Sequence, residues 1–184
     1  MTKTTDARER LLQIIKERAV VHRKVTLSSG QGADYYVDLR RITLDGEAAP
    51  LVGQVMMELT DGLEFDAVGG LTLGADPVAT SMLHATAARG GHLDAFVVRK
   101  SGKAHGLQQR IEGPSIAGRR VVVVEDTTTT GASPLDAVAA VREEGAEVVA
   151  VATIADRATG AQQRIEATGV PYLSVYSVEE LGLA

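Results

Sequence analysis

The sequence has no cysteine and no tryptophan, and it has only two phenylalanines and four tyrosines among 184 residues. Without cysteine the chain has no disulfide framework, no thiolate nucleophile and no cysteine-ligated metal site. Because large aromatic residues are scarce, the core must be built from Val, Ala, Leu and Ile, which suits a Val-rich parallel sheet covered by helices. The length suits one domain with a full core, and we expect a single domain over residues 1–184.

Further absences narrow the class of protein. No apolar run reaches about 18 residues, and the N-terminus has the pattern of an amphipathic helix and not of a signal peptide, so we expect a cytoplasmic protein without a membrane partner. The net charge of −5 disfavours a broad nucleic-acid-binding surface, so no nucleic-acid partner is expected. Neither G-x-x-x-x-G-K-[ST] nor G-x-G-x-x-G after a strand occurs, which disfavours ATPases, GTPases and dinucleotide-binding enzymes.

Hydrophobic periodicity predicts an α/β protein with a parallel sheet, because strands and helices alternate from residue 66 onward. Residues 25–44 are expected to form two or three short strands, which would make a small N-terminal hood mainly over residues 20–45. The predicted helices cover residues 6–19, 47–62, 77–89, 134–145 and 160–168, with a short helix at the C-terminus. The predicted strands cover residues 66–70, 95–99, 120–125, 147–154 and 172–174.

The stretch VVVVEDTTTTGAS, residues 121–133, combines a buried strand with two acids and a row of hydroxyls. In an open α/β sheet ligands bind at the carboxyl ends of the strands, which places Glu125 and Asp126 at that edge. A loop that opens a helix presents unpaired N–H groups and can hold a phosphate, whereas the two acids suit sugar hydroxyls, or a metal through water. The stretch therefore predicts a ribose phosphate-type ligand, with an ordinary polar βα turn as the alternative.

A second stretch, RKSGKAHG over residues 99–106, concentrates positive charge in an acidic chain. No acid lies between Asp94 and Glu112, and Gly102 and Gly106 favour a mobile loop. Such a loop can close over a polyphosphate and stabilise the departing charge, and His105 can donate a proton. A solvated surface loop is the alternative interpretation. The basic residues are Arg99, Lys100, Lys103, His105 and Arg110.

Together the two stretches resemble the type I phosphoribosyltransferases, in which a hydrophobic strand, two acids and a T-x-G-x-[ST]-type loop bind 5-phosphoribosyl 1-diphosphate. The basic stretch, R-K-x-x-K-x-H-G, is similar to the catalytic loop of the orotate-specific members, and so is Asp156-Arg157 after the strand at residues 147–154. The resemblance covers about residues 10–180 and implies a Rossmann-like parallel sheet flanked by helices, with a hood. The hood pattern T-L-x-S-G…Y-Y falls on Thr26, Leu27, Ser29, Gly30, Tyr35 and Tyr36.

The resemblance implies transfer of the 5-phosphoribosyl group to orotate, giving orotidine 5′-monophosphate and diphosphate, in de novo pyrimidine biosynthesis. It implies catalytic roles for Lys103, His105 and Asp126, and orotate binding by Arg157. We further expect Thr129 to hydrogen-bond the base and Tyr36 to lie against the pyrimidine ring, with a strand residue packed on the core as the equal alternative for Tyr36. Residues expected to bind 5-phosphoribosyl 1-diphosphate are Arg99, Lys100, Lys103, His105, Glu125, Asp126, Thr127, Thr128, Thr129, Thr130, Gly131, Ala132 and Ser133.

The resemblance also implies a magnesium cofactor and a homodimer. Mg²⁺ would be held mainly by diphosphate, ribose and water, with no protein ligand set, and the basic loop would reach into the partner subunit's site. The sequence departs from many orotate enzymes at two places, because it has no lysine at Ser28 and none in residues 69–75, GGLTLGA. Backbone N–H groups of residues 72–74 can substitute for a missing lysine.

Two other functions remain open at this point. One is a phosphoribosyltransferase for a purine or uracil, although these generally lack the K-x-H pair and the Asp-Arg pair in this arrangement. The other is a regulator that binds a nucleotide or RNA without catalysis, although an RNA-binding protein would have a more basic surface. The remaining histidines, His22, His84 and His92, show no metal-ligand spacing and are interpreted as structural or surface residues.

Overall fold

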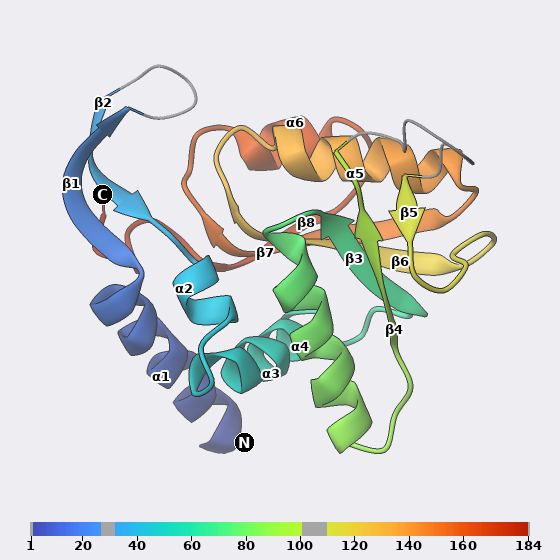
Figure 1. Cartoon of the computed structure of the whole chain (residues 1–184), viewed down its shortest axis with the longest axis horizontal. Coiled ribbons are helices and arrows are strands. Elements are labelled where there is room, and N and C mark those ends of the chain that lie inside the picture. The colour runs from blue at the N-terminus through green and yellow to red at the C-terminus, as the bar shows by residue number, and fades with distance from the viewer. Residues whose placement is uncertain (1, 27–31, 101–109, 184) are drawn as a thin grey trace.

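The computed structural model describes residues 2–26, 32–100 and 110–183, and within them six strands form a central sheet (Figure 1). Their spatial order is β5-β4-β3-β6-β7-β8, and neighbouring strands are parallel except β4 and β5, which are antiparallel. Strand β6 therefore lies inside the sheet, between β3 and β7. The strands are β3 (Ala67–Leu71), β4 (Asp94–Val98), β5 (Ile111–Glu112), β6 (Arg120–Thr128), β7 (Glu147–Asp156) and β8 (Tyr172–Tyr176).

Helices cover both faces of this sheet (Figure 1). The four valines of β6 divide between the faces, as the two-residue period of a strand requires. Val122 and Val124 belong to a core that includes α1, α3 and α4, whereas Val121 and Val123 belong to a core that includes α5 and α6. The helices are α1 (Thr2–Arg18), α2 (Arg40–Thr43), α3 (Ala48–Leu59), α4 (Ala75–Ala88), α5 (Ala132–Glu143) and α6 (Ala161–Glu166).

The hood is a separate antiparallel hairpin of β1 (Val20–Thr26) and β2 (Gly32–Val37), which stands beside the central sheet (Figure 1). Its place within residues 20–45 agrees with the prediction. The possible third strand is wrong, because the chain turns into the short helix α2 directly after β2. The tip of the hairpin, which includes Ser28, Leu27, Ser29 and Gly30, lies outside the described residues.

The α/β class and the parallel sheet flanked by helices are confirmed, with three corrections. Strand β6 continues past residue 125 to Thr128, because Thr128 still pairs with Asp156 of β7. The short antiparallel strand β5 was not predicted. The predicted C-terminal helix is wrong, since residues 178–182 form turns. Among the described helices, none is both long enough and apolar enough to cross a membrane.

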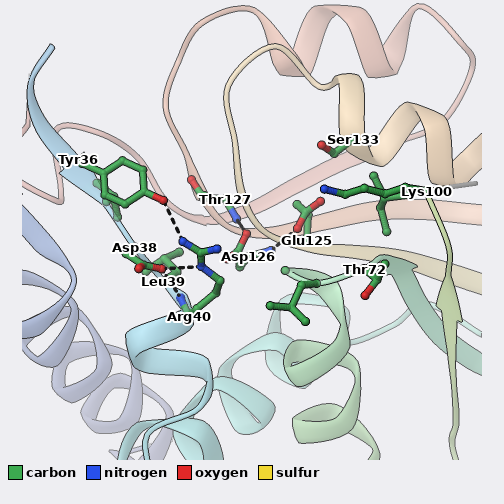
Figure 2. Close-up of a pocket in the computed structure, with 14 residues that line it drawn as sticks. Tyr36, Asp38, Leu39, Arg40, Thr72, Lys100, Glu125, Asp126, Thr127 and Ser133 are labelled. Carbon is green, nitrogen blue, oxygen red and sulfur yellow. Dashed lines mark hydrogen bonds and ion pairs between the residues drawn. The ribbon is translucent and has the colours of Figure 1, made fainter. Parts of the chain in front are cut away.

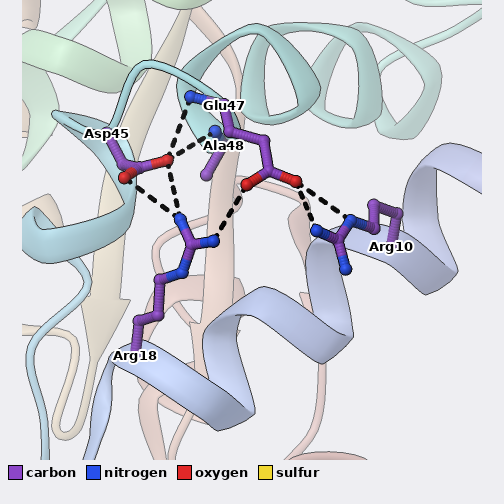
Figure 3. A network of polar contacts seen from close by, with 5 residues as sticks. All are labelled: Arg10, Arg18, Asp45, Glu47 and Ala48. Carbon is purple, nitrogen blue, oxygen red and sulfur yellow. Dashed lines mark hydrogen bonds and ion pairs between the residues drawn. The ribbon is translucent and has the colours of Figure 1, made fainter.

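A cluster of charged side chains joins α1 to the beginning of α3 (Figure 3). Arg10 donates from Nε to Oε1 of Glu47 at 3.1 Å, and Arg18 donates from Nη2 to Oε2 of Glu47 at 2.9 Å. Asp45 accepts the backbone N–H groups of Glu47 and Ala48 at 3.0 Å each, which satisfies donors at the start of the helix. The side chains are partly exposed, so this cluster aligns α1 with α3 more than it adds stability.

Helices α3 and α4 approach each other most closely at Gly53, which is buried. A Cβ atom at residue 53 would lie only 2.2 Å from the backbone oxygen of Ser81 in α4. Because that neighbour is backbone and not the end of a flexible side chain, the two helices would have to move apart to admit a methyl group. The glycine thus sets the spacing between α3 and α4 behind the sheet.

We expect Gly53→Ala to lower the free energy of unfolding by about 1–3 kcal/mol through overpacking of the α3–α4 contact. The measurement is urea-induced unfolding followed by far-UV circular dichroism. Gly46→Ala is the matched control, because a Cβ at residue 46 would meet no atom within 4 Å. Equal unfolding free energies for the two variants would contradict this description of the helix contact.

Candidate active site

A pocket of about 260 Å³ lies where β3, β4 and β6 end and the hood begins (Figure 2). It opens at the carboxyl edge of the parallel strands, where α/β sheets bind their ligands. Its walls come from the hood side, the loop between β3 and α4, the end of β4, the end of β6 and the first turn of α5. The lining residues are Tyr36, Val37, Asp38, Leu39, Arg40, Leu71, Thr72, Leu73, Gly74, Lys100, Glu125, Asp126, Thr127 and Ser133.

Two adjacent carboxylates form the floor of this pocket. Glu125 and Asp126 are 5% and 8% exposed. Oε1 of Glu125 accepts the N–H of Asp126 at 3.2 Å, and Oδ1 of Asp126 accepts the N–H of Thr127 at 2.6 Å. Burial, together with the neighbouring charge of Asp126, raises the pKa of Glu125 to about 9, and burial also raises the pKa of Asp126. The pair is therefore held in an environment that favours a bound cation or hydrogen-bond donor.

The loop after β3 passes directly over the acid pair. A Cβ atom at Gly74 would lie 2.3 Å from Oε1 of Glu125 and 2.7 Å from Oδ1 of Asp126, so a side chain there would displace the two carboxylates. The loop is fixed by Thr72, whose N–H donates to Val98 O at 2.8 Å. The N–H of Thr72 is thus used within the protein, which corrects the expectation that all the N–H groups of residues 72–74 can replace a lysine.

The threonine-rich segment has both buried and accessible parts. Thr128 is 4% exposed, its Oγ1 accepts the N–H of Gly131 at 3.2 Å, and its backbone oxygen accepts the N–H of Arg157 at 3.1 Å. Thr128 therefore joins two loops instead of facing the pocket. Gly131 has φ 76° and precedes α5, a left-handed conformation that glycine adopts readily. Ala132 and Ser133 in the first turn of α5 are exposed, and Ser133 lines the pocket.

The basic stretch is described only at its two ends. Lys100 lines the pocket, whereas Arg99 pairs with Glu112 of β5 at 3.3 Å and is not a lining residue. Arg110 pairs with Asp136 of α5 at 2.8 Å and also donates to the backbone oxygen of Arg99. These contacts attach the stem of the basic stretch to α5. Lys103 and His105, the two residues predicted to be catalytic here, lie outside the described residues, as does Gly106.

Of the three residues predicted to bind orotate, one lines the pocket and two do not. Tyr36 lines the pocket, and its hydroxyl oxygen accepts a hydrogen bond from Nη2 of Arg40 at 3.1 Å. Arg157 follows β7 and is half-buried, and neither Arg157 nor Thr129 lines the pocket. The turn that carries Arg157 is held by Asp156, whose Oδ1 accepts the N–H of Ala158 at 2.9 Å. Thr130 is half-buried and also lies outside the lining.

Comparison with known proteins identifies the family. The phosphoribosyl transferase domain matches residues 45–172. The chain is 76% identical over 180 residues to orotate phosphoribosyltransferase of Streptomyces coelicolor, with 97% of this chain and 99% of that one covered. A crystal structure of Mycobacterium tuberculosis orotate phosphoribosyltransferase in complex with 5-phospho-alpha-D-ribosyl 1-diphosphate is 52% identical, with a TM-score of 0.84, and covers 96% of this chain and 99% of that chain. This chain belongs to the orotate phosphoribosyltransferase family.

The pocket of this orotate phosphoribosyltransferase family member contains residues that the sequence patterns did not reveal. Arg40 is the main one, because its guanidinium lies in the pocket beside Asp126 (Figure 2). Asp38, which pairs with Arg40 at 2.8 Å, is another. The sequence pattern that could have indicated them is Asp38 and Arg40, an acid and an arginine two residues apart directly after β2. Nothing in that spacing shows that the chain turns there toward β6.

Replacement of Glu125 by Gln should flatten the pH dependence of stability in this family member. The folded pKa of Glu125 is raised above the ordinary value of 4.5 to about 9, so between these values the folded protein keeps a proton that the unfolded chain has lost. The free energy of unfolding of the natural protein should therefore fall as pH rises through this range, by at most about 1.4 kcal/mol per pH unit from this group.

The measurement is urea unfolding of the natural protein and Glu125→Gln at several values between about pH 5 and about pH 9. We expect the stability of the variant relative to the natural protein to increase steadily with pH. Glu144→Gln serves as the control, because Glu144 is an exposed acid directly after α5. Parallel pH profiles for the natural protein and Glu125→Gln would contradict the raised pKa.

Proposed function

We propose that this chain transfers the 5-phosphoribosyl group of 5-phosphoribosyl 1-diphosphate to orotate, giving orotidine 5′-monophosphate and diphosphate, in de novo pyrimidine biosynthesis. The observation that carries the proposal is the position of the buried pair Glu125–Asp126 in one pocket with Ser133 at the start of α5. The proposal is supported by the relatives named orotate phosphoribosyltransferase, which include one from Corynebacterium glutamicum that is 60% identical over 178 residues. A biosynthetic role of this kind is consistent with a cytoplasmic enzyme.

Each part of the sugar phosphate has a matching group in the pocket. Glu125 and Asp126 are proposed to accept hydrogen bonds from the ribose hydroxyls. Bound Mg²⁺ and hydroxyl donors would offset the raised pKa values of the pair, and the negative charge that results favours a ribosyl centre that becomes positive as the bond to the leaving group breaks. The 5-phosphate binds at the first turn of α5, near Ser133, where backbone N–H groups and the helix dipole favour an anion. The transition state is thus stabilised by the acids at the ring and by N–H donors at the phosphate.

The diphosphate leaves as an anion and needs positive charge around it. Lys100 supplies such a charge from the end of β4, and Lys103 and His105, farther along the same stretch, are proposed to close over the diphosphate. Arg99 would have to exchange its pairing with Glu112 in order to take part. Orotate is proposed to lie on the hood side, with Tyr36 against the ring, Thr129 donating to the base and the planar guanidinium of Arg157 pairing with the carboxylate.

Magnesium fits the chemistry of the pocket. Mg²⁺ prefers oxygen ligands and keeps several waters. The acid pair offers such oxygens, and Oδ1 of the nearby Asp76 is buried without a hydrogen-bond partner in the described part of the chain. Among the described residues no group of three His, Cys, Asp or Glu side chains forms a metal cage. We therefore propose that Mg²⁺ is held mainly by diphosphate, ribose hydroxyls and water, and that it neutralises the diphosphate charge.

A homodimer would bring a second copy of the basic stretch to each pocket. The described end of this stretch is attached to α5 of its own subunit through Arg110 and Asp136. Two large apolar side chains are exposed at or beside the pocket, Leu44 at 70% and Leu73 at 58%. We propose that the enzyme is a homodimer in which Lys103 and His105 serve the partner subunit's site.

The proposed activity is tested by mixing the purified protein with 5-phosphoribosyl 1-diphosphate, magnesium and one base at a time. We expect the absorbance of orotate to fall, with no turnover of adenine, guanine, hypoxanthine or uracil and no turnover of orotate after magnesium is removed with a chelator. Turnover of a purine or of uracil instead of orotate would contradict the assigned base. No turnover of any base would favour a regulator that binds the sugar phosphate.

The shared site is tested by co-expressing Lys103→Ala and Asp126→Asn subunits that carry different affinity tags. Each variant alone should be inactive, whereas the mixed population should recover about one quarter of the natural activity, because half of the dimers are hybrids with one intact site of two. Tandem purification through both tags shows that hybrids form. Purified hybrids without activity, or a monomer by light scattering, would contradict the shared site.

A further inference from the structure

Arg40 is the one residue of the described pocket lining with a guanidinium group, and two residues of the hood side hold it in place. Its Nε donates to Oδ1 of Asp38 at 2.8 Å, and its Nη2 donates to the hydroxyl of Tyr36 at 3.1 Å. The backbone N–H of Arg40 also donates to Oδ1 of Asp38 at 3.2 Å. Figure 2 shows the guanidinium between this pair and Asp126. The guanidinium is thus held at the pocket by two partners, while its side chain stays partly exposed.

The guanidinium keeps donors for a ligand. Arginine has five N–H donors in a planar fork. Asp38 and Tyr36 take donors from Nε and Nη2, and no acceptor among the described residues takes one from Nη1. The side chain is 44% exposed, so a ligand in the pocket can reach it. Arg40 can therefore bind an anionic oxygen while it stays paired with Asp38.

The charges that line the pocket favour a contact between Arg40 and an anionic ligand. The described lining carries three carboxylates, Asp38, Glu125 and Asp126, and two cations, Arg40 and Lys100. A diphosphate placed beside the acids would be repelled unless cations face it. Lys100 lies on the opposite side of the acid pair from Arg40 (Figure 2). The two cations thus flank the space above Glu125 and Asp126.

The position of Arg40 distinguishes between the two phosphate-bearing parts of the substrate. The 5-phosphate is proposed to bind at the start of α5, near Ser133, which lies away from Arg40 in the pocket (Figure 2). Arg40 instead shares two adjoining surface depressions with Leu73 of the loop after β3. That loop has no cationic side chain, and the N–H of Thr72 is already donated to Val98 O. A cation from the hood side supplies what this loop lacks.

We propose that Arg40 is a substrate-contacting residue that binds the diphosphate group of 5-phosphoribosyl 1-diphosphate from the hood side, opposite Lys100. This inference rests on the proposed function. Arg40 connects the hood with the leaving group, because the same guanidinium is held by Tyr36 and Asp38 next to the proposed orotate position. Binding of the diphosphate would therefore also order the hood side of the pocket for the base.

The test uses Arg40→Gln, with Arg41→Gln as a matched control on the next residue of α2, which is exposed and does not line the pocket. Binding of magnesium diphosphate is measured by calorimetry and needs no turnover. We expect Arg40→Gln to weaken this binding at least about 10-fold, as loss of a charged hydrogen bond does, and Arg41→Gln to change it less than about 2-fold. Unchanged binding in Arg40→Gln would overturn the inference.

Binding of a second ligand shows whether Arg40 contacts the diphosphate or the base. Orotidine 5′-monophosphate carries the 5-phosphate and the orotate carboxylate but no diphosphate, so Arg40→Gln should bind it nearly as well as the natural protein. A loss confined to this nucleotide would overturn the assignment and move Arg40 to the base. Equal losses for both ligands would also overturn it, because they would indicate a distorted pocket.

Two further measurements keep the test decisive. Arg40→Lys retains the charge without the planar fork, so it should bind magnesium diphosphate with an affinity between those of the natural protein and Arg40→Gln. If thermal unfolding shows that Arg40→Gln does not fold, Arg40→Lys is used in its place. An affinity of Arg40→Lys for magnesium diphosphate equal to that of the natural protein would then show that the guanidinium is not needed. Failure of the natural protein itself to bind magnesium diphosphate would contradict the proposed function, and not the role of Arg40 alone.

Discussion

The site depends on two carboxylates buried side by side at the end of β6. Burying Glu125 and Asp126 without a full set of partners costs stability, and it is tolerated because β6 is held on both sides by β3 and β7. The raised pKa of Glu125 is the direct sign of that cost. Natural sites commonly keep such unfavourable groups where a ligand will satisfy them. Under the proposed function, a ribose diol and a Mg²⁺ ion would be suitable partners, because they bring hydrogen-bond donors and positive charge to the acids.

The surroundings of the acid pair follow from this arrangement. Gly74 leaves the two carboxylates in place, because a side chain on the loop after β3 would push them aside. Because the acids repel phosphate, we propose that it binds at the N-terminus of α5, where backbone N–H groups substitute for positive side chains. The two cations of the pocket lie on opposite sides of the acid pair, with Lys100 after the end of β4 and Arg40 on the hood side (Figure 2). The hood thus contributes directly to the pocket and is not only a cover.

The sequence predicted the parts of this architecture that depend on local patterns. Alternating apolar segments indicated the sheet and its helices, and the run of valines followed by two acids located the centre of the site. The remaining features depend on pairing between distant residues. Pairing of Thr128 with Asp156 extends β6, and the buried hydroxyl of Thr128 accepts the N–H of Gly131, so this hydroxyl already has a partner within the protein. Arg40 was missed because only the turn after β2 brings it to Asp126. Nothing in the sequence indicated that Arg99 pairs with Glu112.

The most direct test of the central role of the acid pair is the dissociation constant of 5-phosphoribosyl 1-diphosphate with magnesium for the natural protein and for Asp126→Asn. Asp61→Asn, an exposed acid after α3, is the control. If the acids hold the ribose, Asp126→Asn should bind at least about 10-fold more weakly while the control binds like the natural protein. Equal affinity for Asp126→Asn and the natural protein would contradict the account, because the ribose would then be held by other groups.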